Sequence, residues 1–186
     1  MEPNVLFRLY LDGDENAFAE LIKLLREPLI FFVMRFVQSL SLAEEIAEDA
    51  FVELLIHKER FNFSSSIKTY LFTIARNKAI NYIRRNSRLT DDECLKDAEA
   101  DTQSLEERVI KSDEAKALYK VLDRLNEDYR KALWLVYVED MSYTEAGRVL
   151  GKSTKQIENI VYRAKNAARK ELEKEGIVHE DGTRIY

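Results

Sequence analysis

Apolar residues recur three and four positions apart along most of this chain, and few residues interrupt that spacing. The spacing matches one face of an α-helix, which makes a turn every ~3.6 residues. Only five glycines and two prolines occur among the 186 residues, so signals that end helices are scarce. The sequence therefore predicts an all-α protein.

No segment approaches the roughly 18 consecutive apolar residues of a membrane-spanning helix. The densest run, PLIFFVMRFV, is short and contains Arg35. The opening residues, MEPNVLFRLYLDGDENAF, carry acids where a signal peptide carries a basic start. We expect a cytoplasmic protein without direct membrane insertion.

Residues that could support catalysis are few and scattered. Cys94 is the only cysteine, which excludes an intrachain disulfide, and the two histidines, His57 and His179, lie far apart. The chain has no phosphate-binding glycine loop, G-x-S-x-G or H-E-x-x-H motif. We therefore expect no enzyme activity, no metal and no cofactor.

Positive charge is concentrated in two separate segments, although the net charge is −5. Residues 64–88 hold six basic residues and no acid, and residues 151–174 hold seven basic and three acidic residues. Between them, residues 89–114 hold ten acids and three bases. Phosphate attraction acts over about 10 Å, so such patches predict nucleic-acid binding despite the acidic total, with help from a partner. The simpler alternative is that these clusters are solvated surface charges with no binding role.

The acidic segment 89–114 is polar and poor in large apolar residues, so we expect a flexible linker. It divides the chain into two small helical domains, residues 1–88 and 115–174. The tail, residues 175–186, has no role that the sequence reveals.

The stretch DMSYTEAGRVLGKSTKQIENIVYRAK contains two helix starts eleven residues apart. Ser142 with Glu145, and Ser153 with Gln156, both fit a capping box. Gly151 follows the first helix as a left-handed stop. The pattern predicts a helix, a tight turn and a second helix, which is a helix-turn-helix.

Apolar spacing assigns the faces of these two helices. Gly147 is a poor helix former, so close approach of the helices would explain it. A preceding helix over LNEDYRKALWLVYVED would back the pair through Leu133, Trp134, Val136 and Tyr137. The inner faces are Ala146, Val149 and Leu150, and then Ile157, Ile160, Val161 and Ala164. The outward face of the second helix, with groups that can read base edges and phosphates, is Lys155, Glu158, Asn159, Tyr162, Arg163 and Asn166. A core helix with a solvated polar face is the alternative.

The stretch SIKTYLFTIARNKAINYIRR predicts one long helix that follows a loop, RFNFSSS. Basic groups near aromatic rings suit single-stranded or melted DNA, although the rings would equally fit a core. Its expected buried stripe is Tyr70, Leu71, Ile74, Ala75, Ile80 and Ile83. Its expected basic and amide face is Arg76, Asn77, Asn81, Arg84 and Arg85.

Four stretches resemble, in order, segments of bacterial RNA polymerase sigma factors, specifically the extracytoplasmic-function (ECF) subfamily of the sigma-70 family. YLFTIARNKAINYIRR resembles the promoter-melting segment, with Ile67 where a leading aromatic residue is usual. GDENAFAELIKLLREPL resembles the first helix and LAEEIAEDAFVELL the core-polymerase-binding helix. The stretch from LNEDYRKAL to NAARKEL resembles the second domain.

The resemblance implies a sigma factor that binds core RNA polymerase and directs promoter-specific transcription initiation. Residues 1–88 would be a region 2-like domain that binds core polymerase and recognises and melts the minus-ten element. Residues 115–174 would be a region 4-like helix-turn-helix domain that reads the minus-thirty-five element as a duplex. Implied partners are core RNA polymerase, promoter DNA and an anti-sigma factor.

The resemblance also implies roles for individual residues. Core polymerase would be bound by Glu45, Glu48, Asp49 and Glu53. The minus-ten element would be bound by Asn62, Phe63, Ser64, Ser65, Lys68, Arg76, Asn77, Asn81, Arg84 and Arg85. The upstream element would be bound by Lys155, Glu158, Asn159, Tyr162, Arg163 and Asn166, although Glu158 stands where many members have a basic residue.

A second hypothesis is a helix-turn-helix transcriptional regulator with a helical sensing or dimerisation domain. It would dimerise on a palindrome unaided, but it leaves the acid-free segment 64–88 without a role. A third is a helical interaction protein that has no dependence on DNA.

Overall fold

Every regular element is a helix in the computed structural model, which describes residues 1–87 and 124–174. The prediction of an all-α protein is confirmed for these residues. The predicted linker, Cys94, the first residues of the predicted second domain and the tail lie outside the described residues. The elements are α1 (Pro3–Leu11), α2 (Glu15–Met34), α3 (Leu40–Ile56), the 3₁₀ helix η1 (Lys58–Arg60), α4 (Ile67–Asn86), α7 (Glu127–Leu133), the π-helix η2 (Trp134–Val138), α8 (Tyr143–Leu150) and α9 (Thr154–Lys174).

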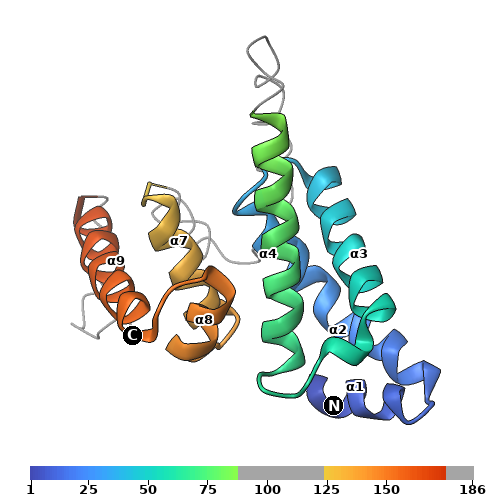
Figure 1. Ribbon diagram of the computed structural model, residues 1–186. Helices are drawn as coiled ribbons and strands as arrows, with labels where there is room; N and C mark the ends of the chain where they lie inside the picture. Colours follow the sequence, from blue (N-terminus) through green and yellow to red (C-terminus); the bar gives the residue numbers. More distant parts are fainter. Residues whose placement is uncertain (88–123, 175–186) are drawn as a thin grey trace.

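Helices α1 to α4 form an amino-terminal bundle in which α2 contacts the other three (Figure 1). Phe7, Phe32 and Phe72 are fully buried at its centre, and the rings of Phe32 and Phe72 lie 5.1 Å apart. Burying one such side chain stabilises a fold by about 1.5–3 kcal/mol. This packing holds α4 firmly along one side of the bundle.

Polar residues in the sequence set where three of these helices begin. Asp14 accepts a hydrogen bond from the Asn16 amide (3.0 Å), and Ser66 accepts one from the Thr69 amide (3.1 Å). Ser39 caps α3 in the same way. Each side chain satisfies an amide that has no partner inside its helix, so the helix ends follow from local chemistry.

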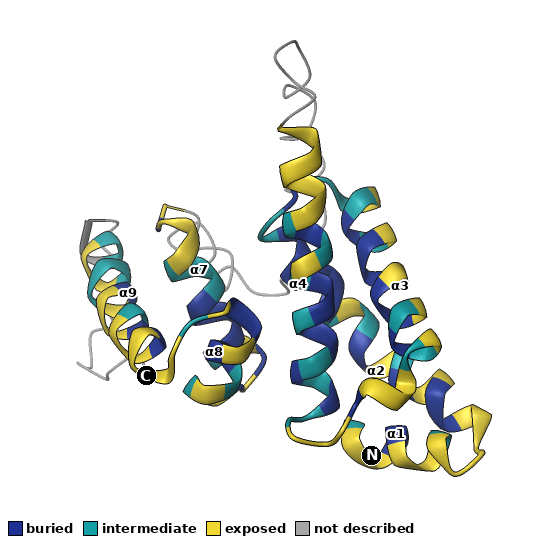
Figure 2. Cartoon of the chain, in the orientation of Figure 1, coloured by how far each residue is buried: buried dark blue, intermediate teal, exposed yellow. Residues whose placement is uncertain are grey.

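Helices α7 to α9 form a smaller carboxyl-terminal group, in which α9 packs against both α7 and α8. Leu135, Val149, Ile157 and Val161 are buried in its centre (Figure 2). The predicted inner faces of the last two helices are thus confirmed, with Ile160 only half-buried.

The helix predicted over LNEDYRKALWLVYVED is α-helical only from Glu127 to Leu133 and continues as the π-helix η2. The Glu139 amide donates to the Trp134 carbonyl, five residues back, at 3.0 Å. Asp140 then takes a left-handed conformation (φ 53°) and ends the segment. This wider turn places the Glu139 side chain in the interior. An α-helical period continued through the segment does not predict that burial.

The buried stripe predicted for α4 is confirmed at three of its six positions. Leu71, Ile74 and Ala75 are buried, whereas Tyr70 and Ile80 are half-buried. Ile83, predicted to be buried, is 41% exposed because the last turns of α4 extend beyond the bundle (Figure 2).

Candidate nucleic-acid interface

Two capping boxes and one glycine define the helix-turn-helix formed by α8 and α9. Ser142 accepts from the Glu145 amide at 3.2 Å while the Glu145 carboxylate accepts from the Ser142 amide at 3.0 Å. Ser153 and Gln156 exchange the same pair of bonds at 3.2 and 2.8 Å. Gly151 adopts φ 65°, the left-handed conformation expected of it. The helix-turn-helix geometry is therefore present, and local sequence chemistry produces it.

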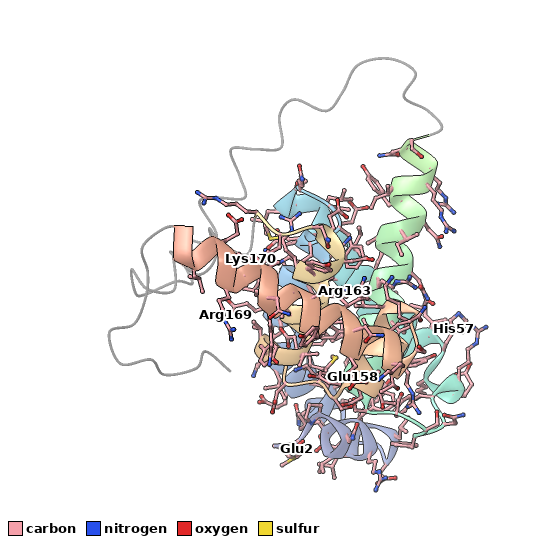
Figure 3. All side chains as sticks on the ribbon, turned by 90° about the vertical axis from the view of Figure 1, so that its left-hand side faces the viewer. Glu2, His57, Glu158, Arg163, Arg169 and Lys170 are labelled. Carbon is pink, nitrogen blue, oxygen red and sulfur yellow. The ribbon has the colours of Figure 1, made fainter. Side chains whose placement is uncertain are left out.

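The outward face of α9 carries a row of polar groups on a long exposed helix (Figure 3). Tyr162 is 69% exposed, and Asn159 and Arg163 are also exposed. Lys155 and Glu158 form an ion pair at 3.0 Å, which offsets the negative charge of that carboxylate. Of the six residues predicted to face outward, only Asn166 is half-buried.

A shallow cavity of about 250 Å³ adjoins this face on the side of α7. Asn159 and Arg163 form part of its wall together with Tyr129 from α7. The exposed amide and guanidinium groups of these residues are thus also accessible from the α7 side of α9. Such groups on an exposed helix are of the kind that contact base edges in a DNA major groove.

The predicted minus-ten residues of α4 do not form one uniform exposed face. Asn77, Asn81, Arg84 and Arg85 are exposed, as expected. Arg76 is half-buried, and burial, together with the nearby positive charge of Arg84, lowers the pKa of its guanidinium.

Lys68, at the start of α4, is half-buried and does not point freely to solvent. Its Nζ lies 2.9 Å from a carboxylate oxygen of Glu139, which is itself buried. The same Nζ donates to the Glu139 carbonyl at 2.8 Å. Lys68 is therefore bound to Glu139 of the carboxyl-terminal group in this structure.

The loop before α4 has a defined shape. The Asn62 side chain accepts from the Ser64 amide at 3.1 Å, and Phe63 between them adopts φ 58°, which is unusual for a non-glycine residue. This turn leaves the Phe63 ring 39% exposed, next to the guanidinium of Arg8 at 5.0 Å. Phe61, in contrast, is buried. One ring of the RFNFSSS loop thus belongs to the core, and the other is partly exposed at the surface, with its centre 4.7 Å from that of the Phe61 ring.

The four acidic residues predicted to bind polymerase lie on α3, and all but the half-buried Glu53 are exposed. Neighbouring helices partly neutralise them. Arg26 of α2 lies 3.3 Å from Glu48, and Lys78 of α4 lies 3.0 Å from Glu53 and 3.8 Å from Asp49. Glu45 and Asp49 remain on the outer face, where they present negative charge.

Two apolar residues continue that outer face and were not predicted to have a role. Val52 is 50% exposed and Ile56 is 64% exposed. With Glu45 and Asp49 they follow the spacing i, i+4, i+7 and i+11, which places all four on one face of α3. That spacing is readable in the sequence, so an apolar extension of the acidic face could have been expected.

Glu145 and Arg148 on α8 were also not predicted to contact α4. One oxygen of Glu145 accepts from Ser66 (3.1 Å) and Thr69 (3.2 Å), which lie at the start of α4. Burial by itself raises the pKa of this carboxyl group, but hydrogen bonds from Ser142, Ser66 and Thr69 outweigh burial and lower the pKa. The carboxylate is thus held in its charged form.

No cluster of three or more histidine, cysteine, aspartate or glutamate side chains suitable for a metal occurs in residues 1–87 and 124–174. Within the same ranges, no helix is both long and apolar enough to cross a bilayer.

Comparison with known families matches two segments of the chain. "Sigma-70 region 2" matches residues 21–89, and "Sigma-70, region 4" matches residues 115–167. The first segment ends just after α4, and the second includes α7, α8 and most of α9.

Individual proteins and structures show the same similarity. The ECF RNA polymerase sigma factor SigW of Bacillus subtilis is 24% identical over 86% of this chain and 91% of its own length. The RNA polymerase sigma-H factor of Pseudomonas aeruginosa is 28% identical over 87% of this chain and 89% of its own length. The sigma factor RpoE of Bartonella quintana, solved with the anti-sigma factor NepR, superposes with a TM-score of 0.63 at 23% identity, over 84% of this chain and 96% of that one. CnrH, solved with the cytosolic domain of CnrY, superposes with a TM-score of 0.64 at 22% identity, over 92% of this chain and 97% of that one.

Proposed function

The chain belongs to the sigma-70 family of RNA polymerase sigma factors, in its ECF subfamily, and on this premise we propose that it binds core RNA polymerase and directs promoter-specific transcription initiation. The observation that carries the proposal is the occurrence of both sigma regions, in order, in one chain. A conventional helix-turn-helix regulator would account for the second region and leave the first unexplained.

We assign the upstream, minus-thirty-five element to α9. The exposed amide of Asn159 and guanidinium of Arg163 supply donors for base edges and phosphates, and Tyr162 adds an exposed ring. Lys155 keeps Glu158 from repelling the DNA backbone as an isolated negative charge. The helix would enter the major groove by its amino-terminal half.

We assign the melted minus-ten element to the loop before α4 and to the exposed residues of α4. The Phe63 ring provides a surface on which an unstacked base can lie. Arg84 and Arg85, near the end of α4, add positive charge for the phosphates. Because the whole chain is acidic, we expect core polymerase to supply much of the affinity for DNA.

We assign core polymerase to the outer face of α3, where Glu45 and Asp49 are followed by Val52 and Ile56. The partner surface would be basic with an apolar edge. An anti-sigma factor is a further proposed partner, in line with the complex described for the RpoE structure. We propose that the protein acts with RNA polymerase in the cytoplasm, in a regulatory and non-catalytic role.

Run-off transcription tests the proposed function. Core polymerase would be incubated with a pool of bacterial promoters, with and without this protein. Discrete start sites that appear only with the protein are the expected result, and their alignment gives both promoter elements. If no transcript starts, while the protein alone shifts a palindromic duplex as a dimer, the conventional regulator replaces this proposal.

Replacing Arg163 with alanine is expected to weaken binding to the upstream duplex by about 1–3 kcal/mol while core binding is unchanged. The side chain is exposed, so its loss removes a DNA contact and no core packing. Arg169→Ala is the matched control, since it removes the same charge from a later turn of the same helix. Equal affinities of the two variants, measured by fluorescence anisotropy on the duplex, would contradict the assignment of Arg163.

A further inference from the structure

Helix α8 of the carboxyl-terminal group packs directly on α4 of the amino-terminal bundle (Figure 1). At the start of α4, the Glu145 carboxylate bonds to Ser66 and Thr69 with one oxygen and to Ser142 of its own helix with the other. A single carboxylate therefore caps α8 and joins it to the first turn of α4. Thr69 is 1% exposed, so this contact is shielded from water.

A buried ion pair lies beside it. Glu139 is 7% exposed, and Lys68 of α4 is the cation that neutralises it, at 2.9 Å. The other carboxylate oxygen of Glu139 accepts from Trp134 Nε1 at 3.1 Å. The Trp134 ring in turn lies 6.3 Å from the ring of Phe31 in α2 and under the guanidinium of Arg35. Undocking would leave Glu139 without this cation, so the pair favours the docked arrangement.

Two further contacts extend the interface along the minus-ten surface. Arg148 of α8 donates to the carbonyl of Ser64, in the loop before α4, at 2.6 Å. The guanidinium of Arg76 lies against Gly151, so closely that a Cβ added to that glycine would be 3.4 Å from it. Ser64, Lys68 and Arg76 are all residues predicted from the sequence to bind the minus-ten element. The carboxyl-terminal helices therefore cover part of the surface that would hold melted DNA.

The upstream-reading face of α9 is not covered in the same way. Asn159, Tyr162 and Arg163 are exposed in the docked structure. Docking thus affects the two proposed DNA surfaces unequally: it covers part of the minus-ten surface, at Ser64, Lys68 and Arg76, and leaves the upstream surface accessible.

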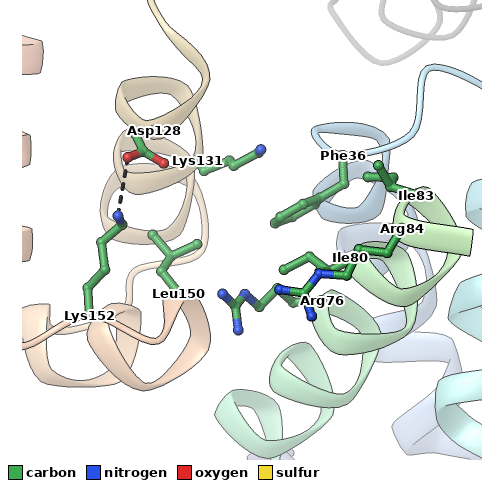
Figure 4. Close-up of a pocket in the computed structure, with 9 residues that line it drawn as sticks. All are labelled: Phe36, Arg76, Ile80, Ile83, Arg84, Asp128, Lys131, Leu150 and Lys152. Carbon is green, nitrogen blue, oxygen red and sulfur yellow. Dashed lines mark hydrogen bonds and ion pairs between the residues drawn. The ribbon is translucent and has the colours of Figure 1, made fainter. Parts of the chain in front are cut away.

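The other end of the interface contains a cavity of about 350 Å³, which separates the two groups of helices there (Figure 4). Four cations and one acid lie around it, and the acid, Asp128, is paired with Lys152 at 3.2 Å. Lys131 is likewise paired with Glu127 at 2.8 Å, and its Nζ lies 4.2 Å from the centre of the Phe36 ring, so a cation–π contact joins the two groups at this end. The residues that line the cavity are Phe36, Arg76, Ile80, Ile83 and Arg84 on one side and Asp128, Lys131, Leu150 and Lys152 on the other.

We propose that the free protein is autoinhibited at one promoter element only: α8 and the residue Glu139 before it dock on α4 through Glu145, Glu139 and Arg148, cover the part of the minus-ten surface formed by Ser64, Lys68 and Arg76, and leave α9 able to read upstream duplex DNA. This inference rests on the proposed function for the identity of the two DNA elements. It requires α8 to leave α4 before melted DNA can be held.

Two single substitutions on the full-length free protein test the proposal. Arg148→Ala removes the bond to Ser64, and Thr69→Val removes a bond to Glu145 while keeping the buried volume. Neither residue belongs to the proposed DNA contacts. Arg169→Ala on the exposed side of α9 is the control, since it changes the net charge as Arg148→Ala does. Far-ultraviolet circular dichroism confirms that each variant is folded.

The chain has a single tryptophan, Trp134, which lies at the interface and reports on docking. We expect both variants to raise acrylamide quenching of its fluorescence about twofold or more. We also expect them to bind a single-stranded oligonucleotide carrying the minus-ten element about fivefold more tightly, with binding of the upstream duplex unchanged. Arg148→Ala removes a positive charge, which alone would weaken DNA binding, so tighter binding identifies release.

If both folded variants match the wild type in quenching and in oligonucleotide binding, the inference is overturned. Run-off transcription by the wild-type protein with core polymerase is read separately. Start sites together with unchanged quenching would overturn autoinhibition and keep the proposed function. Absence of start sites would overturn the proposed function, and quenching alone would still decide whether α8 docks on α4.

Discussion

Replacing Gly147 with alanine is expected to destabilise the helix-turn-helix by about 1–3 kcal/mol, although alanine is the better helix former. A Cβ at this position would lie 2.6 Å from the backbone carbonyl oxygen of Lys152, in the turn between α8 and α9. The propensity gain of about 1 kcal/mol is smaller than the cost of moving that backbone, because Lys152 follows Gly151, whose left-handed conformation sets the turn. The clash should therefore outweigh the gain in helix propensity and make the substitution destabilising.

Urea unfolding followed by Trp134 fluorescence measures this effect, since Trp134 belongs to the same group of helices. The upstream duplex should also be bound more weakly, because the turn orients α9. A variant that is more stable than the wild type would show that the turn accommodates the added methyl group. Gly147 would then be only a weak point in α8.

The sequence predicts the helix-turn-helix in detail because its determinants are local. Ser142 and Ser153 each cap a helix within three residues, and Gly151 supplies a backbone conformation that other residues rarely adopt. The close approach at Gly147 was also expected, and the structure identifies the Lys152 carbonyl as the group approached. None of these features requires knowledge of a distant part of the chain.

The contacts between the two groups of helices could not be predicted in this way. Lys68 and Arg76 read as part of a basic face, yet Glu139 and Gly151, more than seventy residues away in the chain, partly cover them. The buried position of Glu139 depends on the π-helix that precedes it, and an acidic residue at the end of an apolar run gives no sign of that burial. Periodicity finds the face of a helix but not the element that docks on it.

Replacing Asp49 with arginine is expected to weaken binding to core RNA polymerase about 10- to 100-fold, because a negative charge at the centre of the proposed surface becomes positive. The fold should tolerate the change. Asp49 is exposed, its distance to Lys78 is a long 3.8 Å, and Lys78 keeps its closer partner Glu53 at 3.0 Å. Arginine is also the better helix former of the two. A loss of affinity would therefore report on the surface and not on folding.

Glu2→Arg is the matched control, since it makes the same change in net charge at an exposed position preceding α1 with no side-chain capping bond to lose. Affinity for core polymerase is measured by titration with the fluorescently labelled protein at two salt concentrations. A surface contact should lose affinity mainly for Asp49→Arg, and the difference between the variants should shrink at high salt, because screening weakens both the native attraction and the new repulsion. Equal affinities at low salt would remove the charge of Asp49 from the interface and leave Val52 and Ile56, further along the same face, as the part of α3 that contacts core polymerase.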